Sequence, residues 1–182
     1  MRWPSRISDI KIEICATRRE FCGRAVHHPF ELFLAISQIE HRRTEPGDLV
    51  SLVAHGAAGP AVQKSTRVYE GLLAGVVSAN PGLVFEDGRT HLSGDNSRLI
   101  SKDRTVVALA GRVLTKVSME NGTITVGDPI TSASAPGIGM KATKTGKVVG
   151  YALEPAEKDS LILVLVQPGY YVAPERNVLA SS

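Results

Sequence analysis

The chain has 182 residues, of which 43% are hydrophobic and 21% are charged, so it can bury one full core without disulfides or metals. Its net charge of +3 comes from the first 43 residues, which hold 8 Lys or Arg against 5 Asp or Glu, whereas residues 44–182 hold 13 of each. A neutral body argues against a nucleic-acid partner, because affinity for the phosphate backbone comes from clustered cations.

Residues 1–43 differ in composition from the rest of the chain. They contain Trp3, three of the four Phe and both Cys, whereas the remainder is rich in Val, Gly, Thr, Ser and Ala. The apolar spacing within residues 30–39 predicts a short helix, and the alternation of Ile10, Ile12 and Ile14 indicates a short strand. We expect an N-terminal appendage over 1–43, as an irregular cap or a leader foreign to the domain rather than a docking helix.

The two cysteines, Cys15 and Cys22, are spaced too widely for a zinc-binding pair, and no second pair follows them. Adding His27 and His28 gives no standard finger spacing. We expect two free thiols or one incidental disulfide, with no metal and no cofactor.

From residue 45 onward, turn signals such as Gly-Asp, Asn-Pro-Gly, Asp-Gly and Asn-Gly interrupt short apolar runs. This rhythm predicts an all-β domain over residues 44–182, a short-strand sandwich or barrel-like module with hairpins. The predicted strands are Leu49–Val53, Leu72–Ser78, Gly82–Phe85, Thr105–Val117, Thr123–Val126, Gly139–Ala142, Lys147–Leu153 and Leu161–Gln167.

The loop residues Asn121-Gly122 give the strongest local hairpin signal. Both positions accept the positive φ that a two-residue type I′ turn requires. We therefore expect a hairpin between Thr105–Val117 and Thr123–Val126. The same three residues Asn121-Gly-Thr123 match a glycosylation sequon, but the turn accounts for them.

Two strands carry more apolar surface than one sheet face can cover. Leu161–Val166 has no polar residue on either face, and Val106–Ala110 is nearly as apolar, so both should be covered on two sides. In a chain of this length, the second cover can come from another subunit. We expect a homo-oligomer, with three copies around an axis favoured.

The sequence also repeats itself weakly. Gly47-Asp48 followed by Gly71–Ser78 resembles Gly127-Asp128 followed by Gly146–Leu153, each with an internal glycine. A duplicated β-unit accounts for this pattern. The internal glycines, Gly75 and Gly150, should mark bulges or close approaches of the backbone.

Several stretches, taken in order, carry a family resemblance: 45–50 (EPGDLV), 74–82 (AGVVSANPG), 107–113 (VALAGRV), 140–142 (MKA) and 150–154 (GYALE), with turns at Asn121-Gly122, Gly127-Asp128 and Pro136-Gly137. Over residues 44–167, the chain resembles the β-rich C-terminal module of phage tail-fibre, neck-appendage and bacterial surface-fibre proteins. The resemblance implies a non-enzymatic assembly module within a larger fibre or particle, and it favours a virion or extracellular surface over the cytoplasm.

The characterised relatives are intramolecular chaperones that assist trimerisation and then cleave themselves off with an acidic pair. One member of that pair lies in an Asp-x-Ala-Glu-like stretch before the first Gly-Asp turn, where this chain reads Leu34–Arg43 without that motif. No catalytic residue is therefore carried over. An autoproteolytic chaperone with a substituted pair is one alternative, and a trimeric, head-decoration-like capsid-binding protein is another.

Other chemical signals have simpler explanations. Gly146-Lys147 lacks the first Gly and the Ser or Thr of a phosphate loop, so it is a turn into a strand. The lysines at 141, 144 and 147 could form a basic patch, but lysines also protect a strand edge. No apolar stretch approaches the about 20 residues of a membrane span, and the N-terminus has no classical signal peptide.

Loop residues between 55 and 103 allow two further hypotheses. His55 or His91 with Asp95 and Ser93 or Ser97 could form a hydrolytic triad, although no nucleophile elbow frames either serine. The acidic residues Glu86, Asp87, Asp95 and Asp103 lack the alternation of a calcium loop. We expect residues 86–103 to form a flexible loop suited to surface recognition.

Overall fold

The structure is a computed structural model that describes residues 31–36, 44–54, 60–86, 89–92 and 105–174. The described residues are all-β and contain no helix, which confirms the predicted fold class. They form eleven strands: β1 (Glu31–Ile36), β2 (Leu49–Ala54), β3 (Pro60–Lys64), β4 (Leu73–Val77), β5 (Leu83–Glu86), β6 (Arg89–Leu92), β7 (Thr105–Val117), β8 (Pro129–Ser132), β9 (Gly139–Lys141), β10 (Gly146–Ala152) and β11 (Ser160–Tyr171).

The helix predicted over residues 30–39 is wrong, because Glu31–Ile36 form a strand. β1 pairs with β7 in antiparallel register from Glu31↔Gly111 to Ile36↔Thr105, and in parallel register with β5. Pairing with a long neighbouring strand outweighs the local spacing. The sheet therefore extends into the segment assigned to an N-terminal appendage, whose residues 1–30 and 37–43 lie outside the described part.

The hairpin predicted at Asn121-Gly122 is also wrong in its geometry. The amide of Gly122 donates to the carbonyl of Met119 at 2.9 Å, and Gly122 has φ +91° whereas Asn121 is not among the residues with positive φ. A type I′ turn needs positive φ at both central residues. Beyond the turn, Ile124 makes one isolated bridge to Ala156 rather than a strand. The Asn121 side chain instead donates to the carbonyl of Lys141 at 2.9 Å.

Three further differences concern strand boundaries. β3 and β8 lie outside the predicted strands, and β11 continues past its predicted end at Gln167 to Tyr171. The expected loop over 86–103 contains β6, which pairs with β5 along Leu83↔Leu92 to Glu86↔Arg89. Short strands of this kind carry too few residues to show a period of two in the sequence.

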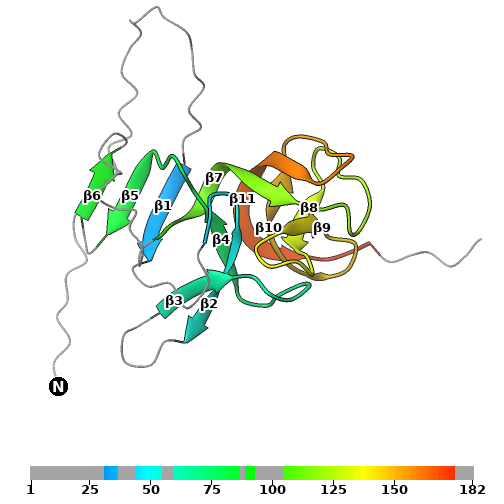
Figure 1. Ribbon diagram of the computed structural model, residues 1–182, viewed down its shortest axis with the longest axis horizontal. Coiled ribbons are helices and arrows are strands. Elements are labelled where there is room, and N and C mark those ends of the chain that lie inside the picture. Colours follow the sequence, from blue (N-terminus) through cyan, green and yellow to red (C-terminus); the bar gives the residue numbers. More distant parts are fainter. Residues whose placement is uncertain (1–30, 37–43, 55–59, 87–88, 93–104, 175–182) are drawn as a thin grey trace, which may run out of the picture.

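Strand β7 is shared by two parts of the molecule. Its first half pairs with β1 and β4, and its second half pairs with β11 and, at Val117↔Gly139, with β9. From β7 the pairing runs through β11, β10, β8 and β9 and returns to β7, so these strands close into a small barrel. This barrel is the rounded part on the right of Figure 1, and β1, β5 and β6 extend from it to the left.

The backbone shows that the chain is built from two equivalent units, as the sequence repeat suggested. The first unit contains β1, β2, β3, β4 and the first half of β7, and the second contains the other half of β7 with β8, β9, β10 and β11. Each unit opens β2 or β8 with a Gly-Asp turn in which the aspartate amide donates to the carbonyl three residues earlier, at 3.1 Å in both.

The hydrogen bonds around these turns match one for one. Gly47 donates to the carbonyl of Val77 at 2.9 Å, and Gly127 donates to that of Ala152 at 2.8 Å. Val77 donates back to Asp48 and Ala152 to Asp128, both at 2.9 Å. This agreement across 80 residues, counted from Gly47 to Gly127, supports an internal duplication.

The internal glycines occupy equivalent places where two strands come close. A Cβ at Gly75 would overlap the carbonyl oxygen of Ala108, and a Cβ at Gly150 would overlap that of Leu165. Gly150 also lies at a register shift between β10 and β11, and Gly75 lies at one between β2 and β4. The prediction of close backbone approaches at Gly75 and Gly150 is confirmed.

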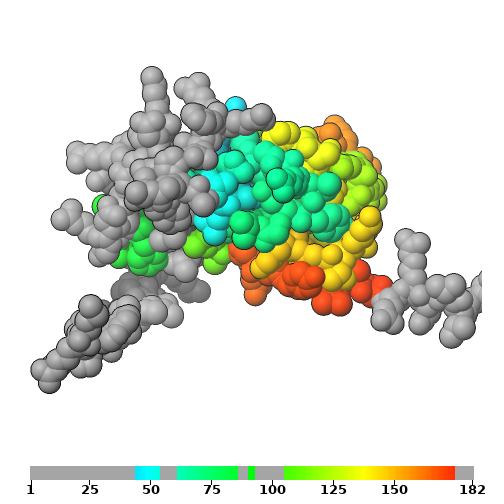
Figure 2. All heavy atoms as spheres, turned by 90° about the horizontal axis from the view of Figure 1, so that it is seen from below, coloured from blue at the N-terminus to red at the C-terminus, as the bar shows by residue number. Residues whose placement is uncertain are grey.

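Two hydrophobic clusters correspond to the two units. The smaller cluster fills the first unit with Val50, Val62, Ala74, Val77 and Val107. The larger cluster fills the barrel of the second unit and also takes in side chains on the outer face of the first unit. The two units are therefore packed together through apolar side chains, and Figure 2 shows their atoms in direct contact.

Candidate functional site

A charged side chain, the carboxylate of Asp48 in the first Gly-Asp turn, is buried. Its Oδ2 accepts hydrogen bonds from the Glu45 amide at 2.7 Å and from Lys64 Nζ at 2.9 Å, and its Oδ1 accepts one from Lys116 Nζ at 2.8 Å. Lys116 also reaches Glu45 Oε2 at 2.7 Å. Asp48 is 1% exposed, so two ammonium groups balance a carboxylate removed from water.

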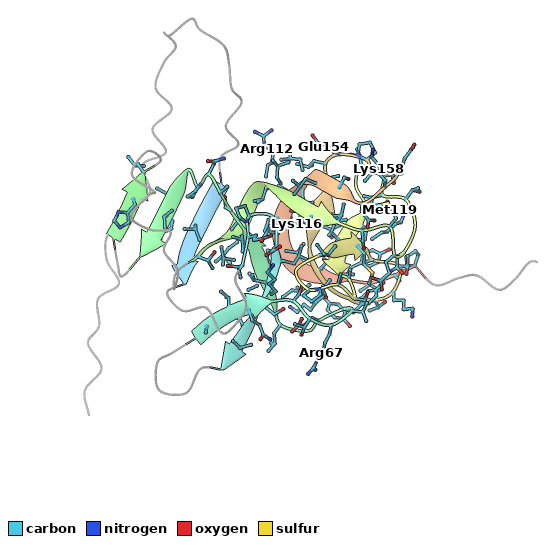
Figure 3. All side chains as sticks on the ribbon, in the orientation of Figure 1. Arg67, Arg112, Lys116, Met119, Glu154 and Lys158 are labelled. Atoms are coloured by element: carbon cyan, nitrogen blue, oxygen red, sulfur yellow. The ribbon has the colours of Figure 1, made fainter. Side chains whose placement is uncertain are left out.

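This cluster joins the two units. Asp48 belongs to the first unit and Lys116 to the second, and the amide of Lys116 donates to the carbonyl of Gly47 at 2.9 Å. Burial alone lowers the pKa of Lys116, but the hydrogen bonds and charges of Asp48 and Glu45 outweigh it and raise the pKa above 10.5. Lys116 thus stays charged at neutral pH, and it lies near the middle of the molecule in Figure 3.

The geometry gives the Asp48 cluster a structural role rather than a catalytic one. A second carboxylate, Glu45, lies nearby, but Lys116 forms ion pairs with both Glu45 and Asp48. The backbone of Gly137 also packs against the Asp48 side chain. A general acid or base must reach the proton that it transfers. Here the carboxylate oxygens of Asp48 are directed at protein donors, and the cluster acts as a brace between the units.

Asp128 is the equivalent residue of the second unit. Its Oδ2 accepts from the amide and hydroxyl of Thr125 at 2.7 and 2.9 Å, and Lys141 Nζ lies 2.8 Å away. Burial raises the pKa of Asp128, but the hydrogen bonds from Lys141 and Thr125 are stronger, so the pKa lies below 3.8. Lys141 is therefore held in an ion pair, and Gly146-Lys147 opens β10 as expected.

The residues of the proposed triad and calcium loop are only partly placed. His91 lies half-buried on β6, opposite Val84 of β5. His55, Ser93, Asp95 and Ser97 lie outside the described residues, as do Asp87, Asp103 and the Cys15, Cys22, His27 and His28 group. Within the described part of the chain, no three His, Cys, Asp or Glu side chains gather as they would around a metal ion.

A second candidate site is an apolar stripe on the outside of the barrel. Leu114 on β7, Tyr151 on β10, and Leu161, Leu163 and Leu165 on β11 point away from the core, because the residues that alternate with them point inward. Pairing brings them together, with Leu163 opposite Leu114 and Leu165 opposite Tyr151. Leu114 and Leu161 are each 54% exposed, Leu165 38% and Tyr151 36%.

Within the single chain, one of the two apolar strands is buried on both faces and the other on one face. Val106, Val107 and Ala108 of β7 are buried on both faces, whereas β11 buries Ile162, Val164 and Val166 but leaves its three leucines partly exposed. The sequence indicated the surplus at Leu161–Val166. It gave no signal for Leu114 or Tyr151, which join the stripe only through strand pairing.

No helix in the described residues is long and apolar enough to cross a membrane. Comparison of the chain with models of known families, with curated proteins and with solved structures found no match.

Proposed function

We propose that the protein is a non-enzymatic assembly module that acts by β-mediated homo-oligomerisation, of the kind found in phage-like or bacterial surface fibres. The observation that carries the proposal is the apolar stripe of Leu114, Tyr151, Leu161, Leu163 and Leu165 on a closed barrel. An apolar patch on the surface of a folded module marks an interaction site. Burial of this stripe against another subunit is the proposed mechanism.

The scaffold beneath the stripe supports this role. The stripe lies on β7, β10 and β11, and β11 is paired with each of the other two, so its side chains hold fixed positions before binding. A pre-organised surface loses little conformational entropy on association. Asp48 and Asp128 form ion pairs that stabilise the two Gly-Asp turns, which favours a structural module over an enzyme.

Size-exclusion chromatography with light scattering on the full chain tests the proposal. We expect a stable oligomer, with a trimer favoured, whose mass is constant over about a hundredfold dilution, as for a dissociation constant well below the working concentration. A monomer at all concentrations would contradict the proposal.

Intact mass measured on the same fractions after a day at room temperature distinguishes the alternatives. One unchanged mass supports the assembly module. A discrete shorter species that accumulates with time would instead identify an autoproteolytic chaperone. Stable binding of the intact oligomer to capsids would favour the head-decoration alternative.

A further inference from the structure

The two units differ in what covers one face of their sheets. In the first unit, the face turned away from its own core carries Val76 of β4 and Ala108 of β7, both 0% exposed. These residues are paired with each other and belong to the same hydrophobic cluster as the core of the second unit. The second unit thus covers this face of the first, since β4 lies against β10 and β11.

The corresponding face of the second unit is uncovered. Tyr151 follows Gly150 as Val76 follows Gly75, and Tyr151 is paired with Leu165 as Val76 is paired with Ala108. Tyr151 and Leu165 are both exposed in part, in contrast to their buried counterparts. The equivalent positions therefore carry larger apolar side chains, which stay partly exposed.

The adjoining Gly-Asp turns show the same contrast. In the first unit, a Cβ added at Gly47 would lie 3.0 Å from Leu161 Cδ2 and 3.2 Å from Lys116 Cγ, both in the second unit. In the second unit, a Cβ added at Gly127 would meet nothing within 4 Å. The contrast lies at the glycine and the aspartate, because Val126 and its counterpart Pro46 are both exposed. The Gly-Asp pair of the turn and the strand face are thus buried together in the first unit and more exposed together in the second.

We propose that this open surface, formed by Tyr151, Leu163, Leu165 and the turn Thr125–Asp128, binds a second copy of the chain. A unit of the same fold is the occupant, because a unit of the same fold already covers the equivalent surface within the chain. The covered and the covering surfaces are different parts of the molecule, so the contact is head-to-tail. Such a contact closes into a ring, a trimer included, or propagates as a filament.

The inference deepens the proposed function and rests on it, and a single charge on the open surface tests it. Leu165→Glu should break the assembly, because its carboxylate and the Arg112 guanidinium opposite it on β7 would both have to leave water at the centre of the contact. The control is Leu52→Glu, on β2, where the leucine is 40% exposed and lies outside the open surface. Removal of a central anchoring side chain weakens an interface at least roughly thirtyfold.

Light scattering over a concentration series reads out the result, with circular dichroism to show that each variant is folded. We expect wild type and Leu52→Glu to form the same oligomer. At the concentrations at which wild type is an oligomer, Leu165→Glu should be a monomer. Tyr151→Glu, at the counterpart of the buried Val76, should also weaken assembly and provides the test if Leu165→Glu does not fold.

The failures of the two proposals are distinguishable. A monomeric wild-type chain would overturn the proposed function and this inference with it. A wild-type oligomer that is unchanged in folded Leu165→Glu or Tyr151→Glu would overturn only the head-to-tail contact.

Discussion

Replacement of Gly150 by alanine tests the close approach that the duplicated architecture requires. An alanine Cβ at this position would overlap the carbonyl oxygen of Leu165, and it would lie 2.8 Å from the Leu165 carbonyl carbon and 3.0 Å from Val166 Cα. Carbon atoms pack at about 3.5 Å or more, so β10 and β11 must separate by about 0.7 Å or more to admit the methyl group.

That separation of the two strands sets the expected loss in the free energy of unfolding. A backbone hydrogen bond of about 2.9 Å would lengthen to about 3.6 Å, beyond the range of a hydrogen bond. Loss of one or two buried hydrogen bonds costs about 1–3 kcal/mol each. Gly150 also has φ +156°, a conformation that side chains rarely adopt. We expect a loss of about 3–5 kcal/mol, much of the 5–15 kcal/mol that stabilises a typical domain.

Urea unfolding of Gly150→Ala measures this loss as a fall in the midpoint at constant m-value. Gly75→Ala should lose a comparable amount, because a Cβ there overlaps the carbonyl oxygen of Ala108. Gly71→Ala is the control, since a Cβ there meets nothing within 4 Å, and its stability should change by less than about 1 kcal/mol. A loss of less than about 1 kcal/mol in Gly150→Ala, as small as in the control, would refute the reasoning.

Three further predictions concern polar contacts. Asp48→Asn should destabilise the chain by about 2–3 kcal/mol in urea unfolding at neutral pH, because it leaves two ammonium groups facing a neutral amide; a loss below about 0.5 kcal/mol, as for a surface pair, would contradict the bracing role. Asp128→Asn should be less stable than wild type at neutral pH. Because the pKa of Asp128 is lowered in the folded state, the difference is complete above 3.8 and should shrink as the pH falls through the folded pKa; a pH-independent difference would contradict it. Tyr69→Phe removes the hydroxyl that accepts from two backbone amides of the β9–β10 turn at 2.7 and 3.0 Å. It should cost about 1 kcal/mol and accelerate hydrogen exchange of those amides, and unchanged exchange would count against the contact.

Local signals in the sequence determined much of the fold. Gly-Asp turns and apolar runs placed the long strand Thr105–Val117 at its observed bounds, because a strand of this length carries enough alternation and a clear stop. The repeated Gly-Asp and internal glycines predicted the two equivalent units. Gly75 and Gly150 were predicted correctly because only glycine admits a backbone oxygen so close.

Long-range pairing decided the features that local signals missed. Glu31–Ile36 is a strand because the first half of β7 offers it a partner, and a helical spacing in six residues is too weak to resist that pairing. Asn121 does not take the type I′ conformation, because its side chain is bound to the carbonyl of Lys141, which is distant in sequence.

The sequence predicted one part of the candidate sites, and the tertiary structure decided the rest. The sequence by itself determined that Leu161–Val166 carries more apolar surface than one face needs, since that depends only on composition along the strand. Only the tertiary structure decided which side chains remain uncovered and which residues join them, because exposure depends on the neighbour across each strand. Leu114 and Tyr151 lie beside Leu163 and Leu165 through pairing alone. The brace at Asp48 likewise depends on Lys116, which reaches it only when the second unit folds against the first.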